Sequence, residues 1–138
     1  MEQQYVMRLL PLLKAIRFYH EHEIIGMGHI PQKGGALLVV NHSLATYDIA
    51  LLIAAIYETT GRISRPLADN LFFKIPYLSK AVDALGAVRG TRSNAKSLLK
   101  AGELVSVAPG GMREALRNSN EKYQLFWKER KGFVRLFD

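Results

Sequence analysis

The chain reads ALLVVNHSLATYDIALLIAAI from Ala36 to Ile56. Its first five residues form a short apolar run typical of a buried strand, and the stretch from Ile49 onward is typical of a helix. Between the two lie His42 and Asp48. A histidine at a strand end with a carboxylate in the next helical turn exposes a general base, because the carboxylate fixes the tautomer of the imidazole. The stretch therefore predicts a strand, a loop and a helix that together carry a candidate site for acyl transfer to a substrate hydroxyl.

The spacing of His42 and Asp48 leaves a second interpretation open. Six positions turn about 600° along a helix, so the two side chains can meet only if His42 lies in the loop and Asp48 in the first helical turn. Ser43 or Thr46 would then lie near the N-cap. In the alternative interpretation Asp48 only stabilises the helix N-terminus and His42 bonds to nearby backbone, because short motifs also match by chance.

Further strands and helices alternate along the chain. Apolar runs predict strands at 63–67, 84–89 and 104–108, and a helix is expected over 94–100, capped by Ser93 or Asn94 and ended by Gly102. This alternation predicts an α/β fold with a largely parallel central sheet flanked by helices. The loops after Val40, Val88 and Ala108 would then leave the sheet at its carboxyl edge, where the active sites of such folds lie.

Two of these loops carry groups suited to anions. Arg89 and Arg92 could hold a phosphate through bidentate contacts, or belong to an ordinary solvated loop. After Pro109, the glycines Gly110 and Gly111 could let backbone amides approach an oxyanion or phosphate, with Arg113 and Glu114 ordering the loop. A plain strand-to-helix turn is the alternative. The loop lacks the lysine and hydroxyl of a Walker A sequence.

Composition narrows the class of partner. At 138 residues the chain fits one domain, its hydrophobic content is 49%, and it has no cysteine, so it has no disulfide and no thiolate metal site. The net charge of +7 favours an anionic partner. The basic residues are spread out, without zinc-finger spacing or a base-stacking strand, so nucleic acid is not the expected partner.

The first 22 residues form a separate segment in this interpretation. Apolar residues fall there at helical spacing and basic residues lie elsewhere on the helix, with Pro11 either kinking the helix or marking its start. We expect an amphipathic helix over 1–22 that lies on a membrane surface or packs on the core of a domain spanning 23–138. No run approaches the roughly 20 apolar residues of a membrane span, and no signal-peptide pattern is present.

Taken together and in this order, the loops resemble the blocks of the glycerolipid acyltransferase superfamily. The chain is most similar to the branch of acylglycerol acyltransferases and transmembrane protein 68-like enzymes. The stretches that carry the resemblance are Asn41 to Asp48, Phe72-Phe73-Lys74-Ile75-Pro76 with Gly86, Ala108 to Leu116, and Arg130 to Val134. Many members of the superfamily have four residues between the histidine and the aspartate, whereas this chain has five.

The resemblance implies a membrane-associated O-acyltransferase that uses acyl-CoA as co-substrate, with no cofactor and no metal. His42 would be the base and Asp48 its orienting partner, while Arg89 or Arg92 would bind substrate and the block at Gly110, Gly111, Arg113 and Glu114 would line the site. Phosphate-acceptor members usually have Pro-Glu-Gly, so Gly110 favours a neutral acylglycerol or related alcohol as acceptor. The membrane surface would be a partner, at the endoplasmic reticulum in a eukaryote or the inner membrane in a bacterium.

The same resemblance implies a further core strand with a fourth block beyond Asp138, so the fold is expected to be incomplete at its C-terminus. Two alternatives therefore stay open. The chain could be a lysophospholipid or lysophosphatidate acyltransferase, as its two arginines suggest, or it could be an inactive truncated isoform or a lipid-binding fragment.

Overall fold

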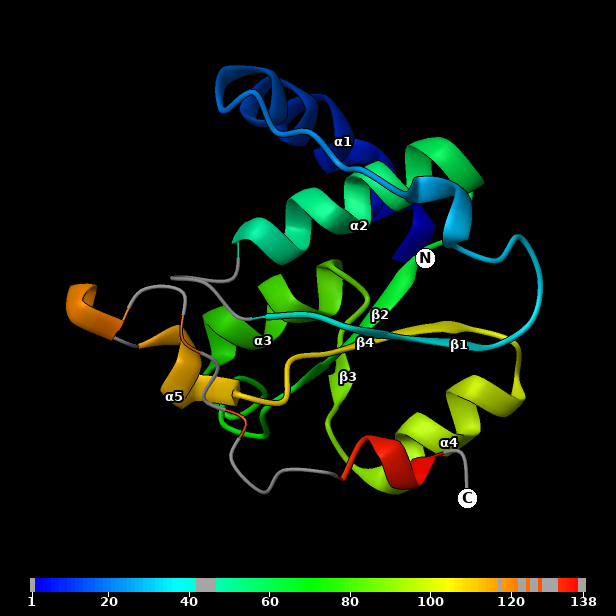
Figure 1. Cartoon of the computed structure of the whole chain (residues 1–138), viewed down its shortest axis with the longest axis vertical. Coiled ribbons are helices and arrows are strands. Elements are labelled where there is room, and N and C mark those ends of the chain that lie inside the picture. The colour runs from blue at the N-terminus through cyan, green and yellow to red at the C-terminus, as the bar shows by residue number, and fades with distance from the viewer. Residues whose placement is uncertain are drawn as a thin grey trace.

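Four short strands form a parallel sheet in the order β1-β4-β2-β3 (Figure 1). This computed structural model describes residues 2–41, 47–116, 118–121, 124, 127 and 132–136. Every pairing in the sheet is parallel. The predicted α/β fold with a largely parallel sheet is therefore confirmed. The strands are β1 (Ala36–Val39), β2 (Ser64–Ala68), β3 (Val88–Arg89) and β4 (Leu104–Val107).

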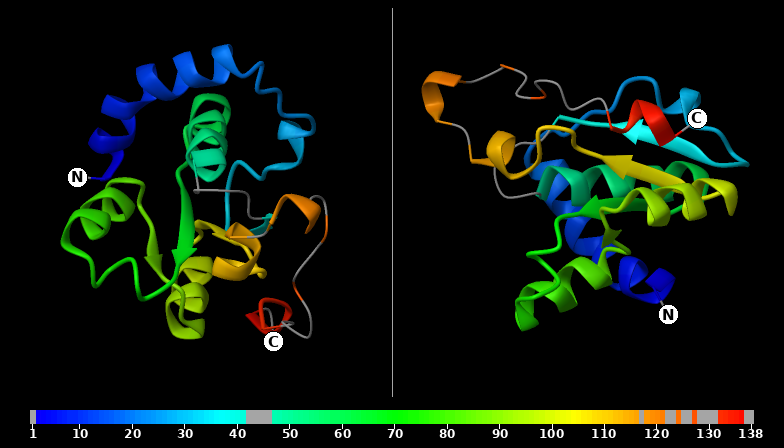
Figure 2. Two further views of the ribbon diagram at one scale, coloured as in Figure 1. Left: turned by 90° about the vertical axis from the view of Figure 1, so that its left-hand side faces the viewer. Right: turned by 90° about the horizontal axis from the view of Figure 1, so that it is seen from below.

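Helices cover both faces of this sheet. α2 packs on β2 and carries α1 on its outer side, while α4 lies on the other face against β4 and the short helix η4 packs on α4 (Figures 1 and 2). The α-helices are α1 (Glu2–Tyr19), α2 (Tyr47–Thr60), α3 (Pro76–Ala84), α4 (Arg92–Lys100) and α5 (Gly111–Ala115). The 3₁₀ turns are η1 (Met27–His29), η3 (Ser119–Glu121) and η4 (Val134–Leu136).

Helix α2 and the central strand β4 supply most of the buried apolar core among the described residues. Leu104 and Val105 are adjacent in β4 and point to opposite faces, yet both are fully buried, as expected for a central strand of a parallel sheet. Leu51, Ile53 and Ile56 of α2 are also at most 2% exposed. The stretch from Ala36 to Ile56 thus supplies one edge strand of the sheet and most of the helix that packs in the core.

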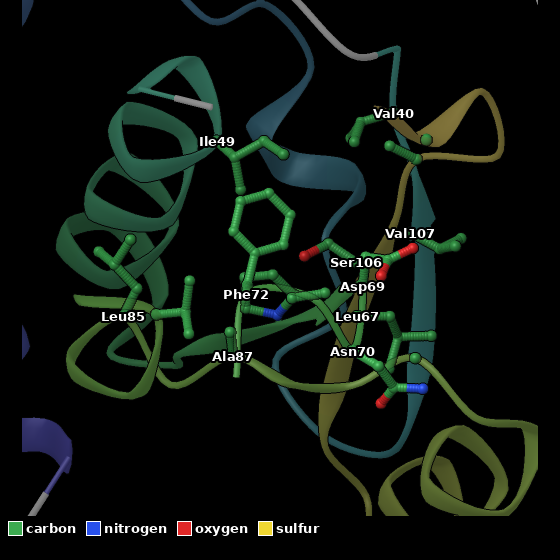
Figure 3. A pocket seen from close by; sticks show the side chains of 16 residues that line it. Val40, Ile49, Leu67, Asp69, Asn70, Phe72, Leu85, Ala87, Ser106 and Val107 are labelled. Carbon is green, nitrogen blue, oxygen red and sulfur yellow. The ribbon is translucent and has the colours of Figure 1, made fainter. Parts of the chain in front are cut away.

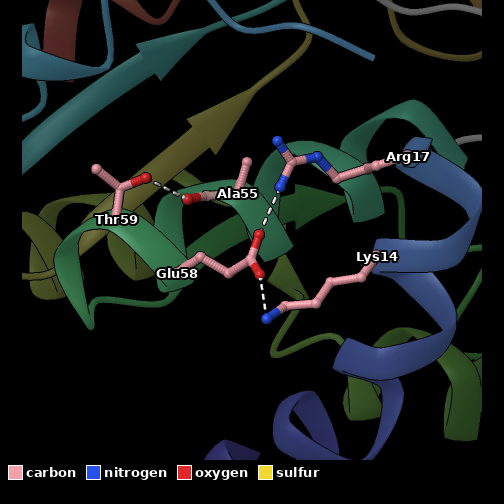
Figure 4. Close-up of polar contacts among 5 residues, drawn as sticks. All are labelled: Lys14, Arg17, Ala55, Glu58 and Thr59. Carbon is pink, nitrogen blue, oxygen red and sulfur yellow. Dashed lines mark hydrogen bonds and ion pairs between the residues drawn. The ribbon is translucent and has the colours of Figure 1, made fainter. Parts of the chain in front are cut away.

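Helix α1 packs on α2 through apolar and charged contacts. Its side chains Leu9, Leu10, Leu13 and Ile16 are half-buried. The carboxylate of Glu58 in α2 forms two ion pairs, with Lys14 Nζ at 2.7 Å and with Arg17 Nη1 at 2.6 Å (Figure 4). The helix begins at Glu2 and continues through Pro11, so Pro11 does not mark its start. Within the described residues, no helix has the length and hydropathy needed to span a bilayer.

The strand expected over 84–89 is wrong in its first four residues. Helix α3 extends to Ala84 and closes with a left-handed glycine, Gly86 (φ +71°). The amides of Gly86 and Ala87 bond back to the carbonyls of Asp83 and Val82, the pattern of a glycine-terminated helix. Only Val88 and Arg89 pair with β2. Pro76 lies at the first position of α3, where its missing N–H costs no hydrogen bond.

The cap of α4 also differs from the expectation. Thr91 has extended backbone angles, and its Oγ1 accepts a hydrogen bond from the amide of Asn94 at 3.2 Å. The helix therefore begins at Arg92, and the predicted caps Ser93 and Asn94 lie inside it. The predicted stop at Gly102 is confirmed by its left-handed backbone (φ +83°).

Candidate active site

The carboxyl ends of all four strands lie at one edge of the sheet. Val39 of β1 is in register with Val107 of β4, and the amide of Val40 donates to the carbonyl of Val107 at 2.9 Å. At the other side, the amide of Gly90 donates to the carbonyl of Ala68 at 2.9 Å. The chain segments that follow β1, β2, β3 and β4 therefore start side by side, as the sequence predicted for three of them.

A cavity of about 310 Å³ opens between these segments (Figure 3). This volume is at the lower end of the range of ligand pockets, roughly 300–1,000 Å³. Residues that follow or end each strand contribute to its wall, together with apolar side chains of α3 and of the segment before it. The lining includes Val40, Ile49, Leu67, Ala68, Phe72, Val82, Leu85, Ala87, Gly90, Val107, Ala108 and Gly111. The site is thus a mainly apolar pocket at the functional edge of an α/β sheet.

His42 itself lies outside the described residues, as do Ser43 and Thr46. The residues on both sides of that segment are described. Val40 precedes it, Ile49 follows it, and both line the cavity. The described residues that flank His42 in the sequence on either side therefore lie at the cavity wall.

Asp48 lies in the first turn of α2, as the sequence predicted. Its side chain is half-buried, and Oδ1 accepts a hydrogen bond from the amide of Ile49 at 3.0 Å. A carboxylate at this place is stabilised by the unpaired amides and positive end of the helix. Asp48 directly precedes Ile49, which lines the cavity, so Asp48 lies beside the cavity wall.

The loop after β4 is a tight turn. The amide of Gly111 donates to the carbonyl of Ala108 at 3.0 Å, and Gly111 has a left-handed backbone (φ +56°) that favours glycine. The Gly111 amide is therefore engaged within the protein. Pro109 and Gly110 are buried, whereas the side chain of Arg113 is exposed.

Glu114 is fully buried, with 0% of its surface exposed. A Cβ placed on Gly110 would lie 2.5 Å from Cβ and 2.6 Å from Cδ of Glu114, and closer still to Oε2. Such distances are too short for any real side chain, so glycine is required at position 110 while Glu114 keeps its place. Glu114 contacts the turn beneath the site and presents no surface to a bound substrate.

Arg89 and Arg92 are both exposed, and neither lines the cavity. The guanidinium of Arg89 lies over the ring of Phe73, with Cζ 5.4 Å from the ring centroid, and its carbonyl accepts from Nδ2 of Asn94 at 2.9 Å. Since β3 is the third strand from β1, the ends of the two strands are separated by about 14 Å at the usual spacing of about 4.8 Å. Arg89 thus lies at the opposite side of the sheet from the end of β1.

Sequence reasoning missed several residues of the cavity wall. Ser106 lines the cavity and is only 3% exposed, and its Oγ has no hydrogen-bond partner among the described residues. A serine within the apolar run 104–108 was the signal that could have identified it. Asp69 and Asn70 also line the cavity, and Asp69 Oδ1 accepts from the amide of Leu71 at 2.9 Å. Their place directly after β2 was the corresponding signal. Phe72 belongs to the quoted second block, but nothing marked it as a pocket residue.

The described part of the chain contains no group of three or more histidine, aspartate or glutamate side chains that could hold a metal ion.

Comparison with known proteins gives a consistent result. Residues 21–138 match the family model described as Acyltransferase. A bovine (Bos taurus) protein named DGAT1/2-independent enzyme synthesizing storage lipids is 38% identical over 118 residues, which cover 86% of this chain and 35% of the relative. The human (Homo sapiens) protein of the same name is 37% identical, with 86% and 36% covered.

A plant protein is more distant. Phytyl ester synthase 1, chloroplastic, of Arabidopsis thaliana is 32% identical over 117 residues, which cover 80% of this chain and 17% of the relative. The chain thus spans about a third of the length of the mammalian relatives. No solved structure gives a significant match.

Proposed function

Because residues 21–138 match its family model, the chain belongs to the Acyltransferase family, and on that premise we propose that it is a membrane-associated O-acyltransferase. It transfers a fatty acyl group from acyl-CoA to the hydroxyl of a neutral acylglycerol or related alcohol. The observation that carries this proposal is the apolar cavity of about 310 Å³, whose wall includes Val40 and Ile49, on either side of His42 in the sequence, and the turn after β4. An apolar pocket beside a histidine loop suits a long acyl chain whose carbonyl reacts at the pocket mouth.

His42 is the general base in this proposal. Its imidazole takes the proton from the acceptor hydroxyl as that oxygen attacks the thioester carbonyl, and a tetrahedral intermediate forms. The intermediate collapses, the carbon–sulfur bond breaks, and the imidazolium returns the proton to the leaving thiolate. The products are the new ester and free CoA. This cycle follows the logic of a serine hydrolase triad in which the substrate supplies the nucleophile.

Asp48 orients the imidazole of His42 and stabilises its protonated form. Support comes from the place of Asp48 in the first turn of α2, where Oδ1 is already fixed by the amide of Ile49. The second carboxylate oxygen is the one assigned to the imidazole. A fixed carboxylate keeps the ring in one tautomer and so leaves the other ring nitrogen to act as base.

Substrate phosphates are assigned to Arg89 and Arg92. Both side chains are exposed, and Arg89 ends β3, the strand farthest from β1 in the sheet. In acyl-CoA the pantetheine arm separates the phosphates from the thioester, so a binding site about 14 Å from the end of β1 suits the donor. Arginine binds phosphate through two parallel hydrogen bonds.

The acceptor is a neutral alcohol in this proposal. The mammalian relatives are named for storage-lipid synthesis and the plant relative for phytyl ester synthesis. Gly110 adds support, since the buried side chain of Glu114 leaves no room for the glutamate usual in phosphate-acceptor members. The second candidate acceptor is a lysophosphatidate or other lysophospholipid, and the exposed pair Arg89 and Arg92 is the observation that favours it.

Helix α1 is assigned to the membrane surface. Its side chains Met7, Leu12, Phe18 and Tyr19 are exposed, with Phe18 at 88% and Tyr19 at 82%. Together with the net charge of +7, this surface suits an anionic lipid interface. The corresponding membrane is the endoplasmic reticulum in a eukaryote or the inner membrane in a bacterium.

An acyl-transfer assay tests the function. The purified chain is mixed with labelled acyl-CoA in lipid micelles that contain monoacylglycerol, a long-chain alcohol or lysophosphatidate. Ester formed on the neutral acceptors, at a rate well above that on lysophosphatidate, is the expected result. Preference for lysophosphatidate would support the second candidate. Release of CoA without any ester, or no reaction by a folded chain that still binds vesicles, would contradict acyl transfer and favour a lipid-binding role.

A further inference from the structure

The side chain of Glu114 occupies the space that a side chain at position 110 would need. Glu114 lies four residues after Gly110, one helical turn further along the chain, and it is fully buried. Its Cβ and Cδ lie 2.5 and 2.6 Å from the position of a Cβ on Gly110. The two positions therefore compete for one volume, which in this chain is filled from position 114.

That volume adjoins the turn that borders the cavity. Gly111 lies in the cavity wall, and its amide closes the turn on the carbonyl of Ala108 at 3.0 Å. Gly110 lies inside this turn. A side chain packed firmly against Gly110 therefore restricts the path from Ala108 to Gly111, since backbone in a close-packed interior has little room to move.

We propose that Glu114 is a positioning residue, whose side chain packs against Gly110, holds the Ala108–Gly111 turn closed and so fixes the cavity wall at Gly111. Gly110 and Glu114 act as a pair in which only one position carries a side chain. The effect on catalysis rests on the proposed acyl transfer, whereas the steric pair does not depend on it.

A double-mutant cycle tests the pair directly. The variants are Gly110→Ala, Glu114→Gly and the double variant, with Glu23→Ala as an exposed acidic control. We expect Gly110→Ala to lower the thermal unfolding midpoint by about 5 °C or more in the presence of Glu114, and by much less in the Glu114→Gly background. The hydrogen-exchange rate of the Gly111 amide should be higher in Gly110→Ala than in the wild type. In the double variant this rate should be close to the rate in Glu114→Gly alone. If Gly110→Ala lowers the thermal unfolding midpoint equally with Glu114 and with glycine at position 114, the proposed steric pair is wrong.

Acyl transfer tests the positioning role. Glu114→Gln keeps the volume of the side chain and should retain the wild-type kcat within about threefold, whereas Glu114→Ala should lose about tenfold or more in kcat while its thermal midpoint stays above the assay temperature. Equal kcat values for Glu114→Ala and wild type would overturn the positioning role. Coupling in unfolding and exchange without any acyl transfer by the wild-type chain would support the steric pair and overturn the proposed function.

Discussion

Val39 of β1 lies directly beside Val107 of β4 in parallel register. This pairing brings the ends of β1 and β4 together. In the sequence, His42 follows Val39 by three residues, and the Pro109-Gly110-Gly111 turn begins two residues after Val107. Residues 40 and 108 both line the same cavity. A one-residue shift of register would exchange the faces of β1 and bury a different set of side chains, so the pairing is fixed by the core it serves. The candidate site is thus a consequence of the sheet topology.

Asp48 gives a prediction for catalysis. Asp48→Asn should lower kcat about 10²–10⁴-fold with little change in KM, because the amide preserves the shape of the side chain but can favour the wrong imidazole tautomer. Steady-state acyl transfer at saturating acyl-CoA measures kcat and KM separately. The exposed Asp83, on α3, provides the control variant Asp83→Asn. A rise in KM alone would show that Asp48 binds substrate and does not orient the base.

Phe72 gives a prediction for acyl-chain preference. Its ring lies in the cavity (Figure 3), so Phe72→Ala should lengthen the pocket and raise the ratio of kcat/KM for long over short acyl-CoA by about tenfold, as expected when pocket volume is matched to methylene groups. The matched control is Tyr77→Ala, since Tyr77 follows in the same segment but is 87% exposed. Competition between acyl-CoA donors of different length measures the ratio. An unchanged ratio would place the acyl chain elsewhere.

Arg89 and Arg92 give a prediction for donor binding. Replacing both by glutamine should raise KM for acyl-CoA about tenfold or more, because each charge-assisted contact to a phosphate is stronger than a neutral hydrogen bond. The KM for the neutral acceptor should change little. Lys80→Gln is the control, as an exposed basic residue on α3. A larger effect on lysophosphatidate than on acyl-CoA would assign the arginines to the acceptor.

Arg62 gives a prediction for stability. Its guanidinium donates to the carbonyls of Pro31 at 2.5 Å, Gly34 at 2.8 Å and Gly102 at 2.5 Å, and so joins three turns at the edge opposite the candidate site. Arg62→Met should lower the free energy of unfolding by about 2–4 kcal/mol, since hydrogen bonds from a charged donor are worth about 1.5–3 kcal/mol each and do not add fully. Chemical denaturation checks this value. An effect no larger than that of Lys80→Met would remove Arg62 from the structural account.

Much of the fold could be predicted from the sequence because long apolar runs encode it. The runs around Val39, Ile53 and Val105 gave two strands and the main helix, and the alternation of elements gave the parallel sheet. The segment before Val88 was harder. Gly86 follows an apolar stretch that resembles a strand, yet it ends a helix that begins at Pro76. In such short segments, apolar content does not distinguish a strand from a helix.

The site was predictable as a set of loops but not as a cavity. A parallel sheet has the carboxyl ends of its strands at one edge, so the loops after Val40, Val88 and Ala108 could be placed at that edge from the sequence alone. The role of Glu114 depends on its contact with Gly110, and the contacts of Arg62 join residues 28 to 40 positions apart. The Arg62 contacts are not visible in local sequence patterns because they join distant segments, and the Gly110–Glu114 contact, although local, depends on the conformation of the turn before α5.

The central claim is that His42 is the general base of acyl transfer. His42→Ala and the wild-type chain are compared in acyl transfer to monoacylglycerol at saturating acyl-CoA, beside His29→Ala, which removes an exposed histidine of η1. Thermal unfolding confirms that all three chains are folded. The account predicts that His42→Ala loses at least about 10²–10⁴-fold in kcat, the usual contribution of a general base, while His29→Ala keeps wild-type activity. A His42→Ala variant that forms ester at close to the wild-type rate would contradict the account.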